Sequence, residues 1–389
     1  MVKAHPPYSK RVRLFMQRKD SLGRKNVTLC VIGATFISIG LVGWCEPYED
    51  VNWCDVSSSW VTPTESRLTF VDLFCGAGGL SKGLEFAGLK GVCGLDYFEA
   101  AERTYRRNFE HRYLNGDVTI SEVKSNLYRI VRERLQGERL GIIVGGFPCQ
   151  GFSMSGNRVV DDPRNSLYRD MVEIVNELKP DFVVCENVKG LRSMLGGAVE
   201  KKIIADYKAI GYEMNVATLC AADYYVPQKR ERVIFIGNRI GKKNYHPKPL
   251  LAPDKYVTVG QAIGDLTNRC EDAKFNHVFT RHRPDMVKRM RKLKEGESVY
   301  DNYSEAWRRC LWNQPSLTVK ENHGGVMVHP ILPRVLTVRE LARLQSFPDY
   351  FIFEGNKSQQ LIQVGNAVPV LLGKAIGLSI RISAGELKE

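Results

Sequence analysis

The sequence lacks the cysteine patterns that hold metals or disulfide frameworks. Its ten cysteines form no CxxC pair and no Cys/His cluster with zinc-ligand spacing, so we expect no bound metal. Scattered thiols in a chain of 389 residues are typical of a reduced, intracellular protein. Internal repeats and low-complexity tracts are also lacking, and 43% hydrophobic with 25% charged residues excludes a wholly disordered or fibrous chain.

Acidic residues are the minority among the charged ones. Lys and Arg number 56 against 43 Asp and Glu, and the net charge of +13 favours a polyanionic partner, nucleic acid first. Residues 1–25 alone hold eight Lys and Arg against the single acid Asp20. More than half of the excess therefore lies in this terminal segment, outside the main body of the chain.

Short apolar runs alternate with helical patterns in the main body. Strands are predicted at residues 68–74, 141–145, 182–185 and 232–237 and in a run that ends at Asp96, with helices at 79–87, 99–109, 121–136 and 167–178. This alternation predicts an α/β fold, a doubly wound and mostly parallel sheet with helices on both faces. Ligands of such sheets bind beyond the carboxyl ends of the strands. Between residues 241 and 330 the alternation stops, which indicates a smaller, irregular domain.

A glycine turn follows the first predicted strand. Its sequence is Gly76-Ala77-Gly78-Gly79, and Asp96 ends the next strand twenty residues after Gly76. The pattern suits an adenosyl cofactor or a dinucleotide, although Ser81 stands where a dinucleotide fingerprint has its third glycine. A tight turn without a ligand is the structural alternative.

Two further strand ends carry reactive side chains. Cys149 follows Pro148, which fixes the turn, and a nucleophilic thiolate there needs a positive or hydrogen-bonding neighbourhood. Glu186 follows the strand at 182–185, where partial desolvation would let a carboxyl hold a proton. The alternatives are an inert buried cysteine and a structural carboxylate.

Residues 228–232 open another strand. Period-two alternation puts Gln228, Arg230 and Arg232 on one face, with Lys229 and Glu231 on the other. Arginines beside a thiolate could favour its ionisation or bind an anionic substrate. An ion pair on an edge strand is the alternative.

Six motifs together resemble the prokaryotic DNA (cytosine-5) methyltransferase family. They are DLFCGAGG (72–79), PCQGFS (148–153), ENV (186–188), QKRERV (228–233), RVLTVRELARLQSFP (334–348) and QVGNAVP (363–369), in the order and with the spacing of that family. The resemblance covers nearly everything from residue 68 to the C-terminus. It implies methyl transfer from S-adenosyl-L-methionine to C5 of a flipped-out cytosine in double-stranded DNA, through a covalent cysteine adduct.

The resemblance also assigns site residues. Cys149 matches the nucleophile, Glu186 the carboxyl that engages the cytosine ring, and Arg232 a contact to the cytosine O2. Gln228 and Arg230 match residues that shape the catalytic site. Expected cofactor contacts are Phe74, Gly76, Gly79, Asp96, Asp117, Pro148, Leu167, Asn366 and Val368, and residues 150–164 resemble a loop that closes over DNA.

Three regions and several partners follow from the resemblance. The catalytic and cofactor domain comprises residues 67–240 plus 360–389, the target-recognition domain 241–359, and a basic extension 1–66. We expect a cytoplasmic, nucleoid-associated monomer that binds no metal and acts beside a cognate restriction endonuclease or as an orphan enzyme. Residues 281–294 hold seven basic residues against Asp285. Met286, Met290 and Leu293 recur there as an apolar stripe at helical spacing, which predicts a surface helix whose basic face is either solvated or in contact with DNA phosphates.

Residues 27–44 do not fit this picture. They are eighteen residues without a charge, long enough to span a membrane, and the positive-inside rule would export the rest of the chain. Because the reaction needs an intracellular cofactor and genomic DNA, we expect no membrane anchor there.

Four rival functions remain to be weighed against this one. A transfer-RNA enzyme of the same family would have a PPCQ-type loop, and an amino-group methylase a Pro-Pro-Tyr-like loop without the cysteine. A catalytically silent relative would not be expected to keep Cys149, Glu186 and Arg232 together. An NAD-dependent enzyme would need hydride chemistry that nothing in the sequence supplies.

Overall fold

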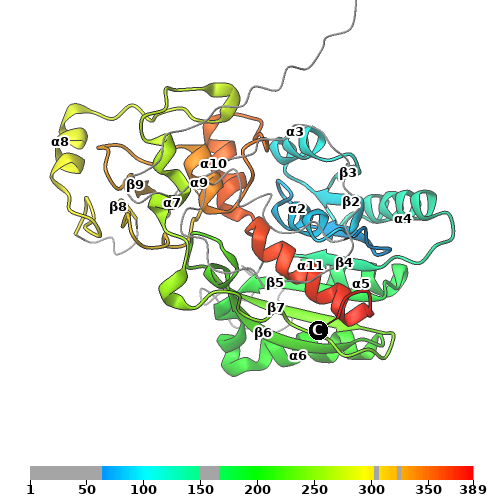
Figure 1. Ribbon diagram of the computed structural model, residues 1–389. Coiled ribbons are helices and arrows are strands. Elements are labelled where there is room, and N and C mark those ends of the chain that lie inside the picture. Colours follow the sequence, from blue (N-terminus) through cyan, green and yellow to red (C-terminus); the bar gives the residue numbers. More distant parts are fainter. Residues whose placement is uncertain (1–63, 149–165, 302–305, 322–325, 389) are drawn as a thin grey trace, which may run out of the picture. The chain divides into compact units, whose positions relative to one another are not determined.

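The structure is a computed structural model and describes residues 64–148, 166–301, 306–321 and 326–388. The centre of this part of the chain is a seven-stranded sheet (Figure 1). Its strand order is β3-β2-β1-β4-β5-β7-β6. The strands are β1 (Thr69–Leu73), β2 (Lys90–Asp96), β3 (Arg112–Asn115), β4 (Ile142–Gly145), β5 (Phe182–Val188), β6 (Glu213–Cys220) and β7 (Glu231–Asn238). β1 to β5 run parallel, whereas β7 is antiparallel to β5 and β6. The predicted α/β, mostly parallel sheet is confirmed.

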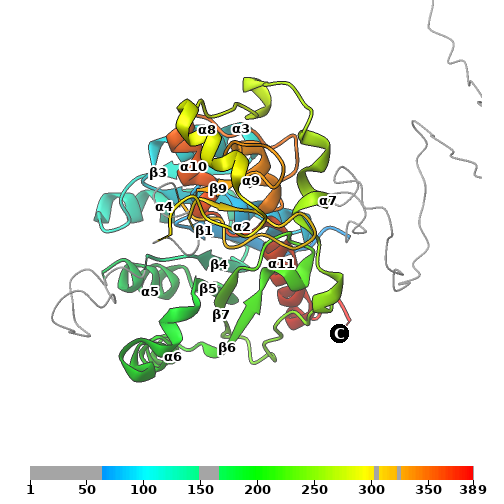
Figure 2. The ribbon, with the colours of Figure 1, turned by 90° about the vertical axis from the view of Figure 1, so that its left-hand side faces the viewer.

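Helices cover both faces of the sheet because its apolar side chains alternate between them. Phe70 and Val144 belong to one buried cluster, and their neighbours Val71 and Ile143 to another. The first cluster includes α2 (Gly79–Phe86), α3 (Glu99–Asn108) and α11 (Val370–Ala384), and the second includes α4 (Ser121–Leu135), α5 (Ser166–Leu178) and α6 (Ala198–Ala209). Figure 2 shows α5 and α6 across the sheet from α11.

The structure differs from the sequence prediction at three strands. β3 and β6 were not predicted, because β3 has four residues and β6 is a half-exposed edge strand with mixed polarity. Glu186 was predicted to follow a strand that ends at residue 185, but it lies within β5. Antiparallel pairing with β7 continues to Val188 opposite Arg232, so β5 is three residues longer.

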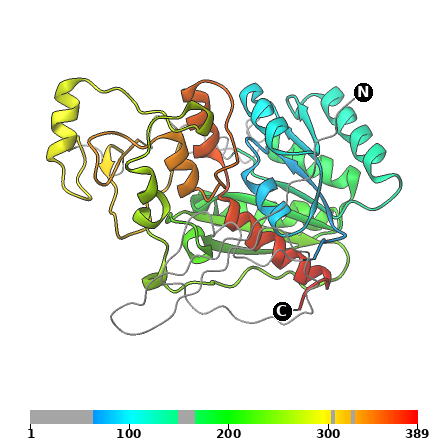
Figure 3. The ribbon, with the colours of Figure 1, turned by 45° about the horizontal axis from the view of Figure 1, so that its top comes forward.

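Short elements replace the alternation after β7, as expected. They are α7 (Val259–Ile263), α8 (Pro284–Lys292), β8 (Arg308–Arg309), β9 (Met327–Val328) and α9 (Val338–Leu344), which Figure 3 shows beside the sheet. In α8, the predicted apolar stripe is confirmed: Met290 is buried and Met286 is partly buried against Val299 and Val328. The basic side chains Lys288, Arg291 and Lys292 are exposed.

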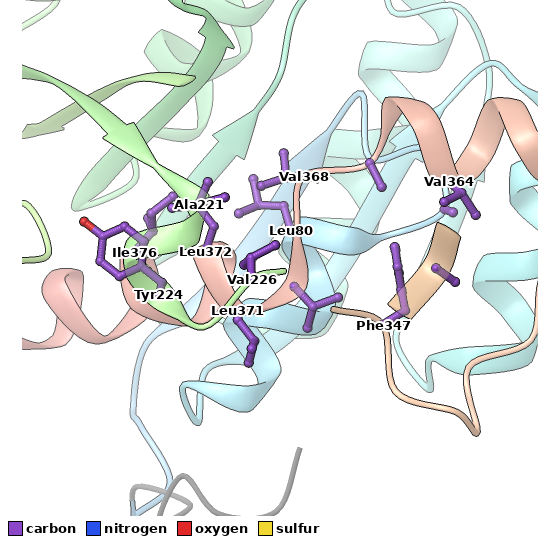
Figure 4. Packing of buried hydrophobic residues seen from close by; sticks show 14 of the residues in the cluster. Leu80, Ala221, Tyr224, Val226, Phe347, Val364, Val368, Leu371, Leu372 and Ile376 are labelled. Atoms are coloured by element: carbon purple, nitrogen blue, oxygen red, sulfur yellow. The ribbon is translucent and has the colours of Figure 1, made fainter. Parts of the chain in front are cut away.

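The C-terminal helices return to the start of the sheet. α10 (Lys357–Asn366) precedes α11, and α11 packs along α2 so closely that a Cβ at Gly83 would lie 2.6 Å from the Gly373 backbone. Figure 4 shows Leu371, Leu372 and Ile376 packed near Leu80 of α2. By length and hydropathy the stretch Lys357–Ala384 could cross a membrane, but 72% of its most apolar window is buried inside the protein. It is a core element of this fold.

The N-terminal boundary of the fold includes Ser66. Ser66 is 2% exposed and its Oγ donates to Glu386 Oε2 over 2.7 Å, while its N–H donates to Gly88 O. Residues 1–63, which contain the apolar segment 27–44, lie outside the described residues. A cut after residue 66 therefore removes these contacts.

Candidate active site

A pocket of about 680 Å³ opens at the carboxyl ends of β1, β2, β4 and β5. This volume is within the usual range of roughly 300–1,000 Å³ for small-ligand sites. The residues that line it are Asp72, Phe74, Cys75, Gly76, Ala77, Leu80, Asp96, Tyr97, Phe98, Gly146, Phe147, Pro148, Glu186, Asn187, Val188, Arg230, Arg232, Val319, Lys320, Glu321, Ile362, Gln363, Gly365, Asn366, Ala367 and Val368. We call the part formed by residues 72–98 the Asp96 half, and the part formed by β4, β5 and β7 the Glu186 half.

The glycine turn gives the Asp96 half its shape. Gly76 has φ +50° and a Cβ there would meet no atom within 4 Å, so the backbone is open to a ligand. Gly78 has φ +89°, and its Cβ would lie 2.5 Å from the Phe109 ring. The first glycine thus leaves space in the pocket, and the second allows packing beneath it.

Asp96 joins the end of β2 to the glycine turn. Its Oδ2 accepts from Gly76 N–H over 2.8 Å, and its Oδ1 accepts from Phe98 N–H over 2.9 Å. Burial raises the pKa of Asp96, and these backbone donors, with that of Tyr97, oppose the shift. A carboxylate has about four acceptor sites, so Asp96 keeps some capacity to accept from a ligand hydroxyl.

Glu186 and Arg232 form an ion pair in the other half. Arg232 Nε lies 2.9 Å from Glu186 Oε1, and the two side chains are only 13% and 11% exposed. A Cβ at Gly146 would lie 3.0 Å from Glu186 Oε2, so a glycine allows the loop after β4 to pass beside the carboxylate. Asn187 Nδ2 donates to Phe147 O over 2.9 Å and holds this loop in place.

Gln228 and Arg230 position the pocket walls. Gln228 is fully buried, its Nε2 donates to Leu344 O and Gln345 Oε1, and its Oε1 accepts from Val319 N–H. Arg230 Nη1 donates to Val319 O over 2.8 Å and contacts Gly365 O. Burial lowers the pKa of Arg230. Among the described lining residues Arg230 is present and Gln228 is not, so Gln228 acts by holding neighbouring segments.

The predicted nucleophile Cys149 and the loop 150–164 lie outside the described residues. The last described residue before them, Pro148, is exposed and lines the pocket. Its neighbours Gly146 and Phe147 contact Glu186 and Asn187, as described above. The described segment before Cys149 therefore passes beside the Glu186 carboxylate.

The expected cofactor residues divide into two groups. Phe74, Gly76, Asp96, Pro148, Asn366 and Val368 line the pocket. Gly79, Asp117 and Leu167 are absent from the described lining. A Cβ at Gly79 would lie 2.3 Å from Val368 O, so this glycine permits packing of α2, and the exposed Asp117 accepts from Thr119 N–H over 2.9 Å. Leu167 packs against the second buried cluster.

Sequence reasoning missed several lining residues. Tyr97 is an aromatic residue directly after Asp96 and is 75% exposed at the pocket, a signal that the sequence offered. Asp72 begins the first motif, yet its place at a strand end did not show that it faces the pocket. Lys320 and Glu321 come from the irregular region, where no periodicity indicated their position.

Within the described ranges, no group of three or more His, Cys, Asp or Glu residues is placed to hold a metal ion.

Comparison with known proteins agrees with this geometry. The family model described as C-5 cytosine-specific DNA methylase matches residues 68–381. The Type II methyltransferase M1.HphI of Haemophilus parahaemolyticus is 38% identical over 330 residues, which cover 80% of this chain and 86% of the relative. M.BspRI of Lysinibacillus sphaericus, also a Type II methyltransferase, is 30% identical over 403 residues, which cover 86% and 87%.

A solved structure agrees as well. A crystal structure assigned as a DNA modification methyltransferase, encoded within an Escherichia coli prophage, has a TM-score of 0.66 at 26% identity and covers 82% of this chain and 99% of its own. The sheet has the strand arrangement of S-adenosylmethionine-dependent methyltransferases. The chain belongs to the C-5 cytosine-specific DNA methylase family and is a DNA (cytosine-5) methyltransferase.

Proposed function

We propose that the protein transfers a methyl group from S-adenosyl-L-methionine to C5 of a cytosine that has left the DNA duplex, within a short specific sequence. The observation that carries the proposal is that one pocket joins two kinds of recognition group. The Glu186–Arg232 pair, 2.9 Å apart, shares its cavity with Asp96 and the glycine turn. One cavity thus holds both the Glu186–Arg232 pair, which can bind the polar edge of a pyrimidine, and the Asp96 carboxylate, which can bind a nucleoside.

The Glu186 half acts on the base. Glu186 engages N3 and the exocyclic amine of cytosine, and Arg232 binds O2, so together they fix the ring and stabilise charge that develops on it. Cys149, next to the lining residue Pro148, adds to C6 and makes C5 nucleophilic. C5 then forms a bond to the methyl carbon of the donor, whose bond to sulfur breaks. Loss of the C5 proton and elimination of the thiolate restore the aromatic ring. The part of Cys149 rests on the family resemblance.

The Asp96 half fits the cofactor. The carboxylate of Asp96 keeps lone pairs for the ribose hydroxyls, and the open backbone at Gly76 gives space for the ligand. Phe74 and Tyr97 offer aromatic rings for the adenine, while Asn366 and Val368 close the opposite wall. S-Adenosyl-L-methionine supplies the electrophilic methyl group when it is bound.

DNA is recognised outside the sheet in this proposal. Unstacking the base costs a few kcal/mol, which phosphate contacts and closure of residues 150–164 offset. Residues 241–359 read the target sequence, and the exposed basic face of α8 contacts phosphates. Residues 67–240 plus 360–389 carry the catalysis. We expect a cytoplasmic monomer that acts beside a restriction endonuclease or alone.

Bisulfite sequencing tests the proposal. In DNA from cells that express the protein, one cytosine within one short motif should resist conversion by bisulfite completely. Cells that express Cys149→Ser should lose this resistance, while the purified variant still binds DNA and cofactor. Methylation of transfer RNA in place of DNA would contradict the substrate, and full activity of Cys149→Ser would contradict the covalent mechanism.

A further inference from the structure

A buried carboxyl group in the Asp96 half has no place in the chemistry above. Asp72 on β1 is 1% exposed and lines the pocket. Its Oδ2 accepts from the Ser81 hydroxyl over 2.6 Å. It makes no ion pair with the described residues within 4 Å, unlike Glu186 with Arg232. Asp72 is therefore a pocket carboxyl whose charge is not neutralised by a cation among the described residues.

A chain of side chains leads from Asp72 to the surface. The Ser81 Oγ lies 2.7 Å from the Tyr105 hydroxyl, and that hydroxyl lies 2.7 Å from His111 Nε2. On the other side of the ring, His111 Nδ1 lies 3.4 Å from Glu85 Oε1, and the Glu85 side chain is 28% exposed. Ser81 and Tyr105 are fully buried. Every link can both give and accept a proton, so the chain joins the pocket to solvent.

Burial and the nearby Asp96 carboxylate favour uptake of a proton by Asp72. From β2 it faces the Asp96 carboxylate, from the glycine turn the Cys75 thiol, and from α3 the Tyr105 hydroxyl. Burial raises the pKa of Asp72 to about 7, although hydrogen bonds from Ser81 oppose the shift. A cation bound in the pocket would reverse this balance by favouring the ionised carboxylate.

We propose, resting on the proposed function, that Asp72 senses the charge of the cofactor and selects the sulfonium donor over its thioether product. The donor bears one positive charge more than S-adenosyl-L-homocysteine. Asp72 gives up its proton through Ser81, Tyr105 and His111 when the donor binds, and recovers one proton after the methyl group has left. The ionised carboxylate of Asp72 attracts the positively charged donor. The neutral carboxyl has no such attraction for the uncharged thioether of the product. Product release follows from the loss of that attraction.

Proton counting tests the proposal on the unmodified protein. Isothermal titration calorimetry at about pH 6.5, in two buffers of different ionisation enthalpy, measures the protons released when each ligand binds. Roughly half a proton or more should leave with S-adenosyl-L-methionine and far less with S-adenosyl-L-homocysteine, because Asp72 is mostly protonated before binding. Equal release by the two ligands would overturn the proposal.

A variant measures selectivity without relying on activity. Asp72→Asn keeps an acceptor for Ser81 and removes the charge, so the preference for donor over product at about pH 8 should fall by roughly tenfold. Asp170→Asn, which changes a carboxylate paired with Lys124 on α4, should keep the preference. Tyr105→Phe should also keep it, since the charge of Asp72 remains.

The outcomes separate this inference from the proposed function. An Asp72→Asn protein that folds and keeps the wild-type preference would refute the charge sensor alone. If Asp72→Asn does not fold, the proton count of the wild-type protein decides. A wild-type protein that binds neither ligand would instead refute the proposed cofactor, and with it the function.

Discussion

The two halves of the pocket are built in different ways. The Asp96 half comes from one continuous stretch, residues 72–98, and its main contact joins Gly76 to Asp96 twenty residues later. The Glu186 half depends on β4, β5 and β7, and its walls are held by bonds from Arg230 to Val319 and Gly365, 89 and 135 residues away. The Asp96 half is thus local, whereas the Glu186 half requires most of the chain.

This difference indicates which substitutions should disturb each half of the pocket. A single βαβ unit positions the Asp96 half, so changes elsewhere should leave it intact. The Glu186 half depends on distant segments that meet at Gln228 and Arg230. Substitutions can therefore separate cofactor binding from base chemistry.

The largest effect is expected at the centre of the Glu186 half. Glu186→Gln removes the charge opposite Arg232, so that arginine loses its ion-pair partner. Methyl transfer should fall by roughly 10²- to 10³-fold, because a preorganised group that stabilises developing charge is lost. Binding of S-adenosyl-L-methionine, measured by calorimetry, should stay within about twofold. A matching loss of cofactor affinity would show that the halves are not separable.

Substitution in the Asp96 half should have a smaller effect, and it should lower cofactor affinity more than base chemistry. Asp96→Asn can accept from only one of the two backbone donors, Gly76 or Phe98. Cofactor affinity should fall by about 10- to 100-fold, the cost of a hydrogen bond to a charged group. Asp117→Asn should change the affinity less, since Asp117 is exposed and lies outside the described pocket lining. Equal losses would place the adenine against Asp117.

Gln228 tests the long-range support of the base site. Gln228→Ala leaves the buried Val319 N–H and the Gln345 side chain without this partner. The free energy of unfolding should fall by about 1–3 kcal/mol, and activity should fall more than cofactor affinity. Gln314→Ala, at an exposed position, is the matched control. Unchanged stability of Gln228→Ala in urea would contradict the role given to this residue.

The smallest effect is expected away from both halves. Burial lowers the pKa of His329 to about 4, below the usual 6.5, next to Glu340 and Arg334. The unfolded chain therefore takes up a proton between these values that the folded chain does not, and stability falls as the pH drops from about 6.5 towards 4. This should cost about 1–2 kcal/mol by pH 5. His329→Asn, whose side-chain oxygen can accept from Ile331 and Leu332 N–H as His329 Nδ1 does, should flatten that part of the pH profile of urea denaturation.

Much of the Asp96 half could be predicted from the sequence. Gly76 and Asp96 lie at strand ends, and the carboxyl ends of parallel strands meet at one edge of a sheet. The alternation at residues 228–232 was also predicted: Gln228 and Arg230 are buried, and Lys229 and Glu231 are exposed. The alternation of side chains along a strand and the order of the strands in the sequence are enough for these predictions, and no long-range contact has to be known.

The rest depended on contacts that no local pattern records. Glu186 lies inside β5 because β7 pairs antiparallel with β5 up to Val188. β7 in turn lies between β5 and the edge strand β6 and pairs antiparallel with both. Gly79 resembles a cofactor glycine, yet it permits close packing against residues 367 and 368. These outcomes follow from tertiary pairing, which a motif alone does not specify.

The docking of α11 onto α2 has a consequence for synthesis of the enzyme. Residues 362–368, immediately before α11, complete the wall of the pocket that begins at residue 72. On the ribosome, the first βαβ unit emerges long before these residues do. A nascent chain can therefore form its first strands but has no complete pocket. Under the proposed function the catalyst remains inert until nearly its last helix has been translated, so an interrupted product cannot mark the genome.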